Sequence, residues 1–313
     1  MVDKTDATTL YSVPPPPFSS NKRQRFNMTM REHHVDLMQI LTRVGDPRYA
    51  FLIYFLLAYC LHRATGTRVL WIACLSEWLN GVLKCPSGHA MVTSAVLYSI
   101  GTSFMKHGIQ QATAVERVLD WVSFKVVLVA VNVSRLFIAT HFTHQVLAGS
   151  LTGILLAEVV KHEHTSGLTF KHYAIWCIVL VIGVYVTYFG ITILSLDPLW
   201  SLTLAKKWCA NPEWVHPDTT PFFAFTRDMS SLLGFGAGIS LRDKMKTTLD
   251  IGMGQKLVYV TLSLTLTMLV ENFKIPSTSP VFYVIGFVKF NIMCVGIVFV
   301  IPYLVFTNKK KKN

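Results

Sequence analysis

Nine apolar runs divide most of the chain into segments that are long enough, or nearly long enough, to cross a lipid bilayer as helices. About twenty apolar residues are needed for one helical crossing. The runs lie near residues 49–66, 68–84, 90–105, 119–139, 145–161, 173–195, 220–241, 256–271 and 281–306. This pattern predicts an all-α, polytopic transmembrane bundle of about nine spans over residues 46–306, between a polar tail at 1–45 and a basic tail at 307–313.

The composition excludes an ordinary soluble protein. Hydrophobic residues make up 52% of the 313 residues and charged residues only 15%, whereas soluble domains carry about 25% charge. The net charge of +12 does not indicate nucleic-acid binding, because the charges lie in loops and at the ends between apolar runs. Charges in those positions orient helices in a membrane. The six cysteines contain no CxxC spacing and predict no disulfide framework.

The distribution of basic residues predicts an orientation in the membrane. An odd number of spans puts the termini on opposite sides, and a cytosolic C-terminus places most loop lysines and arginines in the cytosol. The basic N-terminal tail opposes this assignment. Lys309–Lys312 resemble a dilysine signal for retrieval to the endoplasmic reticulum (ER), or equally anchor the last helix. A glycosylation sequon at Asn27 counts only if the tail is lumenal.

A first cluster of turn-forming and reactive residues, Cys85-Pro86-Ser87-Gly88-His89, immediately precedes the third apolar run. Proline and glycine favour a turn, and the helix that follows presents backbone N–H groups at its N-terminus without helical acceptors. Such a helix end binds anions, and His89 lies beside it. The alternative is a helix-capping turn with an incidental histidine.

A second cluster, Arg135 and His141, lies at the end of the fourth apolar run. The two residues are six positions apart, roughly 600° around a helix, so one straight helix would place them on different faces. A helix that ends near Thr140 lets His141 turn back towards Arg135. No acidic residue lies between Asp120 and Glu158, so an external anion explains the arginine better than a local carboxylate does.

Together the two clusters supply groups for phosphoryl transfer. One histidine can attack phosphorus while the other protonates the leaving alkoxide. An arginine binds phosphate oxygens through two hydrogen bonds, and with backbone N–H groups it stabilises the charge of the transition state. The sequence has neither an HExxH metal motif nor a P-loop, and it predicts no metal and no cofactor.

These motifs resemble motifs two and three of the type-2 phosphatidic-acid phosphatase superfamily, which includes the vanadium haloperoxidases. Within it, the chain is most similar to the glucose-6-phosphatase catalytic subunit family. The resemblance extends from about Gly45 onwards. Three segments carry it: PSGHAM at 86–91, HFTHQ at 141–145, where Gln145 stands in place of the usual Asp, and the tryptophan-containing segment 208–222.

The resemblance implies a role for each residue. His141 would be the nucleophile that forms a phosphohistidine, and His89 would protonate the leaving sugar oxygen and then activate water. Arg135, with the backbone N–H groups of Ser87 and Gly88, would hold the phosphoryl group. The substrate would be glucose 6-phosphate, hydrolysed on the lumenal side of the ER membrane during gluconeogenesis and glycogenolysis, and a glucose-6-phosphate transporter would deliver it.

One part of the family pattern is broken. The first motif is a Lys, six residues and then Arg-Pro. Lys84 matches its opening and is assigned to phosphate binding, but Cys85 follows at once and the chain contains no Arg-Pro. Losing one preorganised donor costs roughly 10²–10³ in rate. The sequence therefore leaves a catalytically silent membrane scaffold as the alternative to an active phosphohydrolase. A lipid phosphate phosphatase, which shares motifs two and three, fits the sequence less well.

Overall fold

The computed structural model describes residues 34–83, 86–108, 114–138, 140–162, 167–200, 202–203, 220–245, 252–273 and 280–307. Within these residues the regular structure is entirely helical. After a first helix, His34–Val44, the elements are α2 (Pro47–Tyr49), η2 (Ala50–Tyr54), α3 (Phe55–Leu61), α4 (Arg63–Leu83), α5 (Gly88–Gly108), α6 (Ala114–Phe137), α7 (Thr143–His162), α8 (Phe170–Ile193), α10 (Pro221–Lys244), α11 (Met253–Asn272), α12 (Val281–Val295), η5 (Gly296–Val300) and α13 (Ile301–Thr307). Each of the nine apolar ranges overlaps a helix, and the all-α prediction is confirmed.

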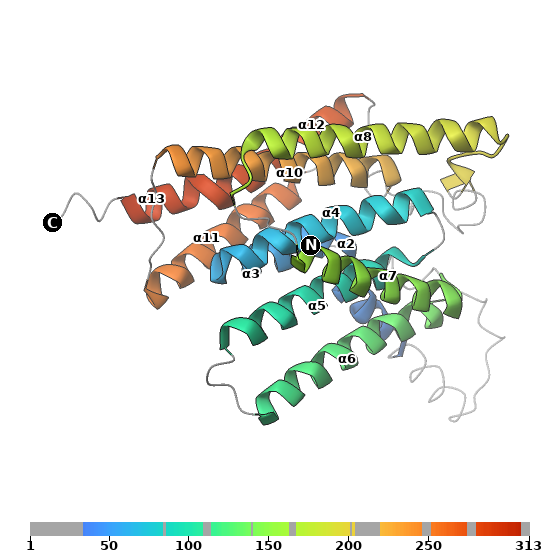
Figure 1. Ribbon diagram of the computed structural model, residues 1–313, viewed down its shortest axis with the longest axis horizontal. Helices are drawn as coiled ribbons and strands as arrows, with labels where there is room; N and C mark the ends of the chain where they lie inside the picture. The colour runs from blue at the N-terminus through green and yellow to red at the C-terminus, as the bar shows by residue number, and fades with distance from the viewer. Residues whose placement is uncertain are drawn as a thin grey trace, which may run out of the picture.

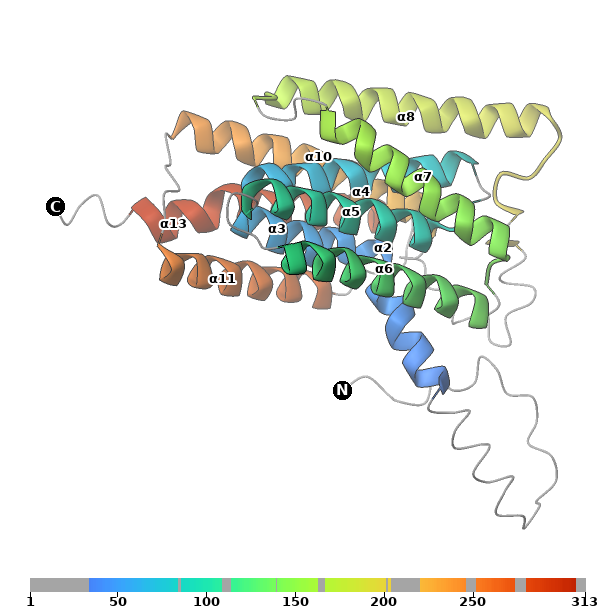
Figure 2. The same cartoon turned by 60° about the horizontal axis from the view of Figure 1, so that its bottom comes forward.

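Most of the long helices run roughly along one common direction, as expected of a bundle that crosses a bilayer (Figure 1). One side of the bundle is formed by α5, α6 and α7, and the other by α8, α10 and α12, with α4 in contact with helices of both groups. Figure 2 shows α5 and α7 lying side by side, and the helix His34–Val44 leading away from the bundle.

Three helical segments of the described chain are long and apolar enough to cross a membrane: α7, α8 and the continuous stretch Val281–Val305. The helices His34–Val44 and Pro47–Leu61, bent by 44° at their junction, form a fourth such segment if they act as one span. Other long helices carry charges inside their apolar runs, which lowers their hydropathy; Glu77 in α4 and Asp228 in α10 are examples. Nine crossings therefore stay a prediction.

The outer surface of the bundle is apolar in the way that a lipid-facing surface requires. Only 11% of the apolar window of α8 is buried inside the structure. Its outward side chains include Ile175, Ile178, Ile182 and Val186, each more than half exposed. A continuous apolar face of this size marks contact with a membrane or a partner, and in a chain of this composition the lipid bilayer covers it.

Aromatic side chains join the central helices. The ring of Phe235 on α10 lies 5.6 Å from Phe55 and 5.4 Å from Tyr59, both on α3. It also lies 5.7 Å from Tyr173 on α8, whose ring stacks on Trp71 of α4 at 5.4 Å. Edge-to-face and stacked pairs at these distances contribute beyond the area that they bury, so this cluster fixes α3, α4, α8 and α10 relative to one another.

The boundary between the first two predicted spans lies earlier than the apolar runs indicate. The predicted run 49–66 ends as a helix at Leu61, because His62 adopts an extended backbone (φ −147°, ψ 105°). The Thr65 N–H group then donates to the Nδ1 atom of His62 at 3.3 Å and caps the start of α4. The predicted boundary at residues 66–68 was therefore wrong, because the helix ends at Leu61 and hydropathy does not reveal a cap made by a histidine side chain.

Candidate active site

The turn between α4 and α5 is held by side chains on both of its flanks. Ser87 is the N-cap of α5: its Oγ accepts a hydrogen bond from the Ala90 N–H group at 3.5 Å, and its carbonyl oxygen accepts from Met91 at 2.9 Å. On the other side, the Asn80 Nδ2 group of α4 donates to the Pro86 carbonyl oxygen at 2.5 Å. Pro86 and Ser87, the described residues of this connection, are therefore bonded to α4 and α5 respectively.

Helix α7 packs directly against this turn. The Ser87 N–H group donates to the Gln145 carbonyl oxygen at 3.0 Å. At Gly149, one turn further along α7, an added Cβ would lie 2.6 Å from the Ser87 carbonyl oxygen, so only glycine permits this approach. The sequence assigned the Ser87 N–H group to phosphate; in the structure that group is bonded to α7 instead. Gly88, the other half of that assignment, does line the cavity described below.

The structure brings Arg135 and His141 to the same cavity. Helix α6 ends at Phe137, and the N–H and Oγ1 groups of Thr140 both donate to the Arg135 carbonyl oxygen, at 3.3 and 3.2 Å. These bonds turn the chain back over the end of the helix. The arginine is only 8% exposed although it lies at the cavity wall. The end of the helix shortly before His141, as the sequence indicated, therefore allows Arg135 and His141 to reach the same cavity.

Gln145 fixes the chemical state of the His141 ring. Its Oε1 atom accepts a hydrogen bond from the Phe142 N–H group at 3.0 Å, which identifies that atom as the amide oxygen. The same oxygen lies 3.4 Å from His141 Nδ1. An acceptor at Nδ1 favours the tautomer protonated there, so Nε2 keeps its lone pair. Burial, and secondly the charge of Arg135, lower the pKa of His141 below its ordinary value of 6.5.

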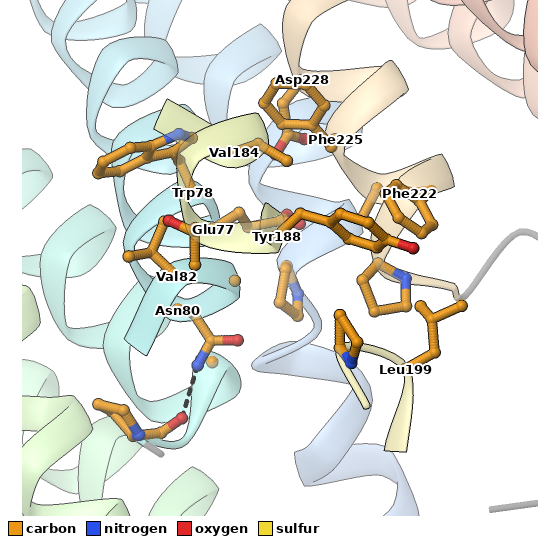
Figure 3. Close-up of a pocket in the computed structure, with 18 of the residues that line it drawn as sticks. Glu77, Trp78, Asn80, Val82, Val184, Tyr188, Leu199, Phe222, Phe225 and Asp228 are labelled. Atoms are coloured by element: carbon orange, nitrogen blue, oxygen red, sulfur yellow. Dashed lines mark hydrogen bonds between the residues drawn. The ribbon is translucent and has the colours of Figure 1, made fainter. Parts of the chain in front are cut away.

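His89, Arg135 and His141 line a cavity of about 410 Å³. Its opposite wall comes from α8 and α10 and contains aromatic side chains such as Tyr188 and Phe225, visible in Figure 3. A cavity of this volume lies in the usual range for small-molecule sites. Among the described residues, no group of three His, Cys, Asp or Glu side chains is placed to hold a metal ion.

Several residues singled out in the sequence lie outside the described part of the chain. These are Lys84, Cys85, the Asn27 sequon, Lys309–Lys312 and most of segment 208–222.

Sequence reasoning also missed polar residues that the structure places in the cavity. Asn80 and Glu77 reach it from α4, and Asp228 from α10. The available signal was that Glu77, Arg227 and Asp228 interrupt apolar runs, since an ionisable residue within a membrane span is costly and is usually retained for function.

Comparison with known proteins agrees with this geometry. Residues 75–165, which contain the turn, Arg135 and His141, match the family model described as the PAP2 superfamily. The chain is also 32% identical over 309 residues to "Glucose-6-phosphatase 3" of Bos taurus, an alignment that covers 85% of this chain and 88% of the relative. The chain belongs to the glucose-6-phosphatase family.

Other members of the glucose-6-phosphatase family are related to a similar degree. "Glucose-6-phosphatase 2" of Homo sapiens is 32% identical over 327 residues, covering 86% of this chain and 90% of the relative. "Glucose-6-phosphatase catalytic subunit 1" of Felis catus is 31% identical over 319 residues, covering 86% and 88%. No solved structure is significantly similar to the chain. Family and superfamily together identify a membrane protein of the phosphohydrolase class.

Proposed function

We propose that this protein hydrolyses glucose 6-phosphate to glucose and inorganic phosphate through a phosphohistidine at His141. The observation that carries the proposal is the convergence of His89, Arg135 and His141 on one cavity, beside the first turn of α5. The substrate is taken from the printed names of the relatives, which are glucose-6-phosphatases.

The first chemical step breaks the phosphate ester. The Nε2 lone pair of His141 attacks phosphorus and forms a P–N bond, while the bond from phosphorus to the sugar oxygen breaks. Protonated His89 gives its proton to that oxygen, so glucose leaves as a neutral alcohol. Arg135 and the N–H groups at the start of α5, including that of Gly88, stabilise the charge on the phosphoryl oxygens.

The second step returns the enzyme to its starting state. Neutral His89 takes a proton from water, and the water oxygen attacks the phosphohistidine. The P–N bond breaks, phosphate leaves, His141 is neutral again and His89 is protonated.

Proton uptake by His89 depends on the substrate in this scheme. Burial, and secondly the charge of Arg135, lower the pKa of His89 below its ordinary value. A phosphate dianion bound beside Arg135 brings an opposing negative charge, which favours the protonated imidazole. His89 therefore becomes an acid when the substrate arrives.

We place the enzyme in the ER membrane with nine spans, a lumenal active site and a cytosolic C-terminus carrying Lys309–Lys312. The basic residues of the predicted cytosolic loops support this orientation. A lumenal site needs a carrier for an anionic sugar phosphate, so a glucose-6-phosphate transporter is the proposed partner.

Phosphate release from glucose 6-phosphate by microsomes containing this chain tests the proposal, with microsomes lacking the chain as the blank. We expect release above the blank, increased when detergent opens the vesicles. Because the Arg-Pro of the first motif is absent, the rate should lie roughly 10²–10³ below that of a relative with the complete motif. Release equal to the blank, with the protein inserted, would identify a silent scaffold.

The pH dependence gives a separate prediction. Neutral His141 is the reactive form, and its lowered pKa keeps it neutral at lower pH than an ordinary histidine. The acid limb of the profile should therefore lie below pH 6.5, at the lowered pKa where protonation removes the attacking lone pair of His141. The measurement is kcat/KM between about pH 4.5 and 8. An acid limb centred at or above 6.5 would contradict the burial of His141 beside Arg135.

A further inference from the structure

A buried charge cluster outside the phosphoryl-transfer groups lies at the cavity. Nη2 of Arg227 on α10 donates to both carboxylate oxygens of Glu77 on α4, at 2.6 and 2.5 Å. Nε and Nη2 of the same arginine donate to Oδ1 of Asp228 at 3.2 Å. The exposed fractions of the three side chains are 3% for Arg227, 10% for Glu77 and 2% for Asp228. Both carboxylates line the cavity.

The cluster is not balanced as a purely structural ion pair would be. Two carboxylates share one guanidinium in a largely apolar interior, and burying such a cluster is costly unless each member has a hydrogen-bond partner. All recorded bonds to the Asp228 carboxylate go to Oδ1; within the described residues, its Oδ2 atom accepts no hydrogen bond. An ionised carboxylate oxygen accepts hydrogen bonds, and Asp228 lines the cavity, so Oδ2 is available to a donor group on a ligand there.

The position of the cluster indicates which part of a ligand supplies that donor. Figure 3 shows Asp228 and Phe225 at one end of the cavity and Asn80, bonded to the PSGH turn, at the other, with Tyr188 between them. The carboxylates would repel the phosphate end of a ligand, which would lie instead near the turn and Arg135. A neutral group with hydroxyl donors and apolar C–H faces suits the carboxylates and the aromatic wall.

We propose that Asp228 and Glu77, held in place by Arg227, accept hydrogen bonds from hydroxyl groups on the organic part of the phosphate ester. This subsite selects neutral, polyhydroxylated monophosphates and disfavours esters whose organic part is apolar or carries a second negative charge. The inference rests on the proposed function, because phosphate binding at the turn sets the direction in which the ester enters.

The test compares Asp228→Asn with the wild type on two substrates. Glucose 6-phosphate has hydroxyl groups for the subsite, whereas p-nitrophenyl phosphate has none and reports phosphoryl transfer alone. We expect kcat/KM for glucose 6-phosphate to fall about 10- to 100-fold, since a hydroxyl that loses its charged acceptor costs this much. The value for p-nitrophenyl phosphate should change less than about threefold. Asp243→Asn, exposed at the far end of α10, is the matched control.

A binding measurement keeps the two proposals separate. In a His141→Ala background, Asp228→Asn should weaken binding of glucose 6-phosphate by the same factor and leave binding of inorganic phosphate unchanged. Equal loss for both ligands, or no loss for either, would overturn the subsite. If the wild type hydrolyses neither substrate, the proposed function fails, and this binding difference alone decides the inference. If Asp228→Asn does not fold, Glu77→Gln takes its place in both measurements.

Discussion

Replacing His141 with alanine is expected to abolish the acid-labile, base-stable phosphoenzyme and to reduce phosphate release at least about 10⁴-fold, as removal of a nucleophile does in other enzymes. His141 lines the cavity with Arg135, and Gln145 lies against its Nδ1 atom, which leaves Nε2 for the proposed attack on phosphorus. The measurements are labelling with ³²P-labelled substrate in the acid-quenched enzyme and release of phosphate at steady state.

His144→Ala is the matched control, because it removes a histidine from the same segment. His144 is exposed and its ring stacks on Phe142 at 5.8 Å. It does not line the cavity. We expect labelling and turnover of this variant to stay within about twofold of the wild type, since surface substitutions usually have small effects. Undiminished labelling in His141→Ala would move the nucleophile to another residue.

The second large effect is expected for Arg135. Removing its guanidinium with Arg135→Ala should lower kcat/KM about 10²–10³-fold, the usual cost of one preorganised donor to a transition-state oxyanion. The backbone around it should persist, because Thr140 bonds to the main-chain carbonyl of Arg135 and not to its side chain. Arg135→Lys keeps the charge but loses the planar guanidinium fork, so its kcat/KM should lie between those of the wild type and Arg135→Ala.

Lys125→Ala serves as the control for Arg135 because it removes an exposed cation from the same helix. Its kcat/KM should match that of the wild type. Arg135→Ala should also raise the acid limb of the pH profile, since the arginine charge is one of the two causes that lower the pKa of His141. Normal turnover in Arg135→Ala, or an unshifted acid limb, would show that the arginine does not act on the reacting groups.

Local sequence signals located most of the helices. Long apolar runs predict helices because a chain in lipid satisfies its backbone hydrogen bonds most simply within one helix. The interruption at His62 was missed because its cap depends on Thr65, three residues further on, and not on hydropathy. The helix His34–Val44, assigned to the polar tail, was missed because it lies before the first of the nine apolar runs, which begins near residue 49.

The candidate site was partly predictable. Its residues were found from the chemistry of PSGH and of an arginine six positions before a histidine, since those spacings restrict where a helix begins and ends. The use of the Ser87 N–H group was not predictable, because it depends on the close approach of α7 at Gly149. The pairing of Glu77 with Arg227 was not predictable either, since 150 positions separate them along the chain.

The sequence by itself determined the class of protein, the positions of most helices and the residues with the right chemistry, because hydropathy and helix-end signals act over a few residues. Only the tertiary structure decided which of those residues share a cavity and which N–H group is already bonded. It also brought Glu77 and Asp228 to that same cavity. These features depend on how α4, α7 and α10 pack, and packing joins residues whose separation along the chain carries no local signal.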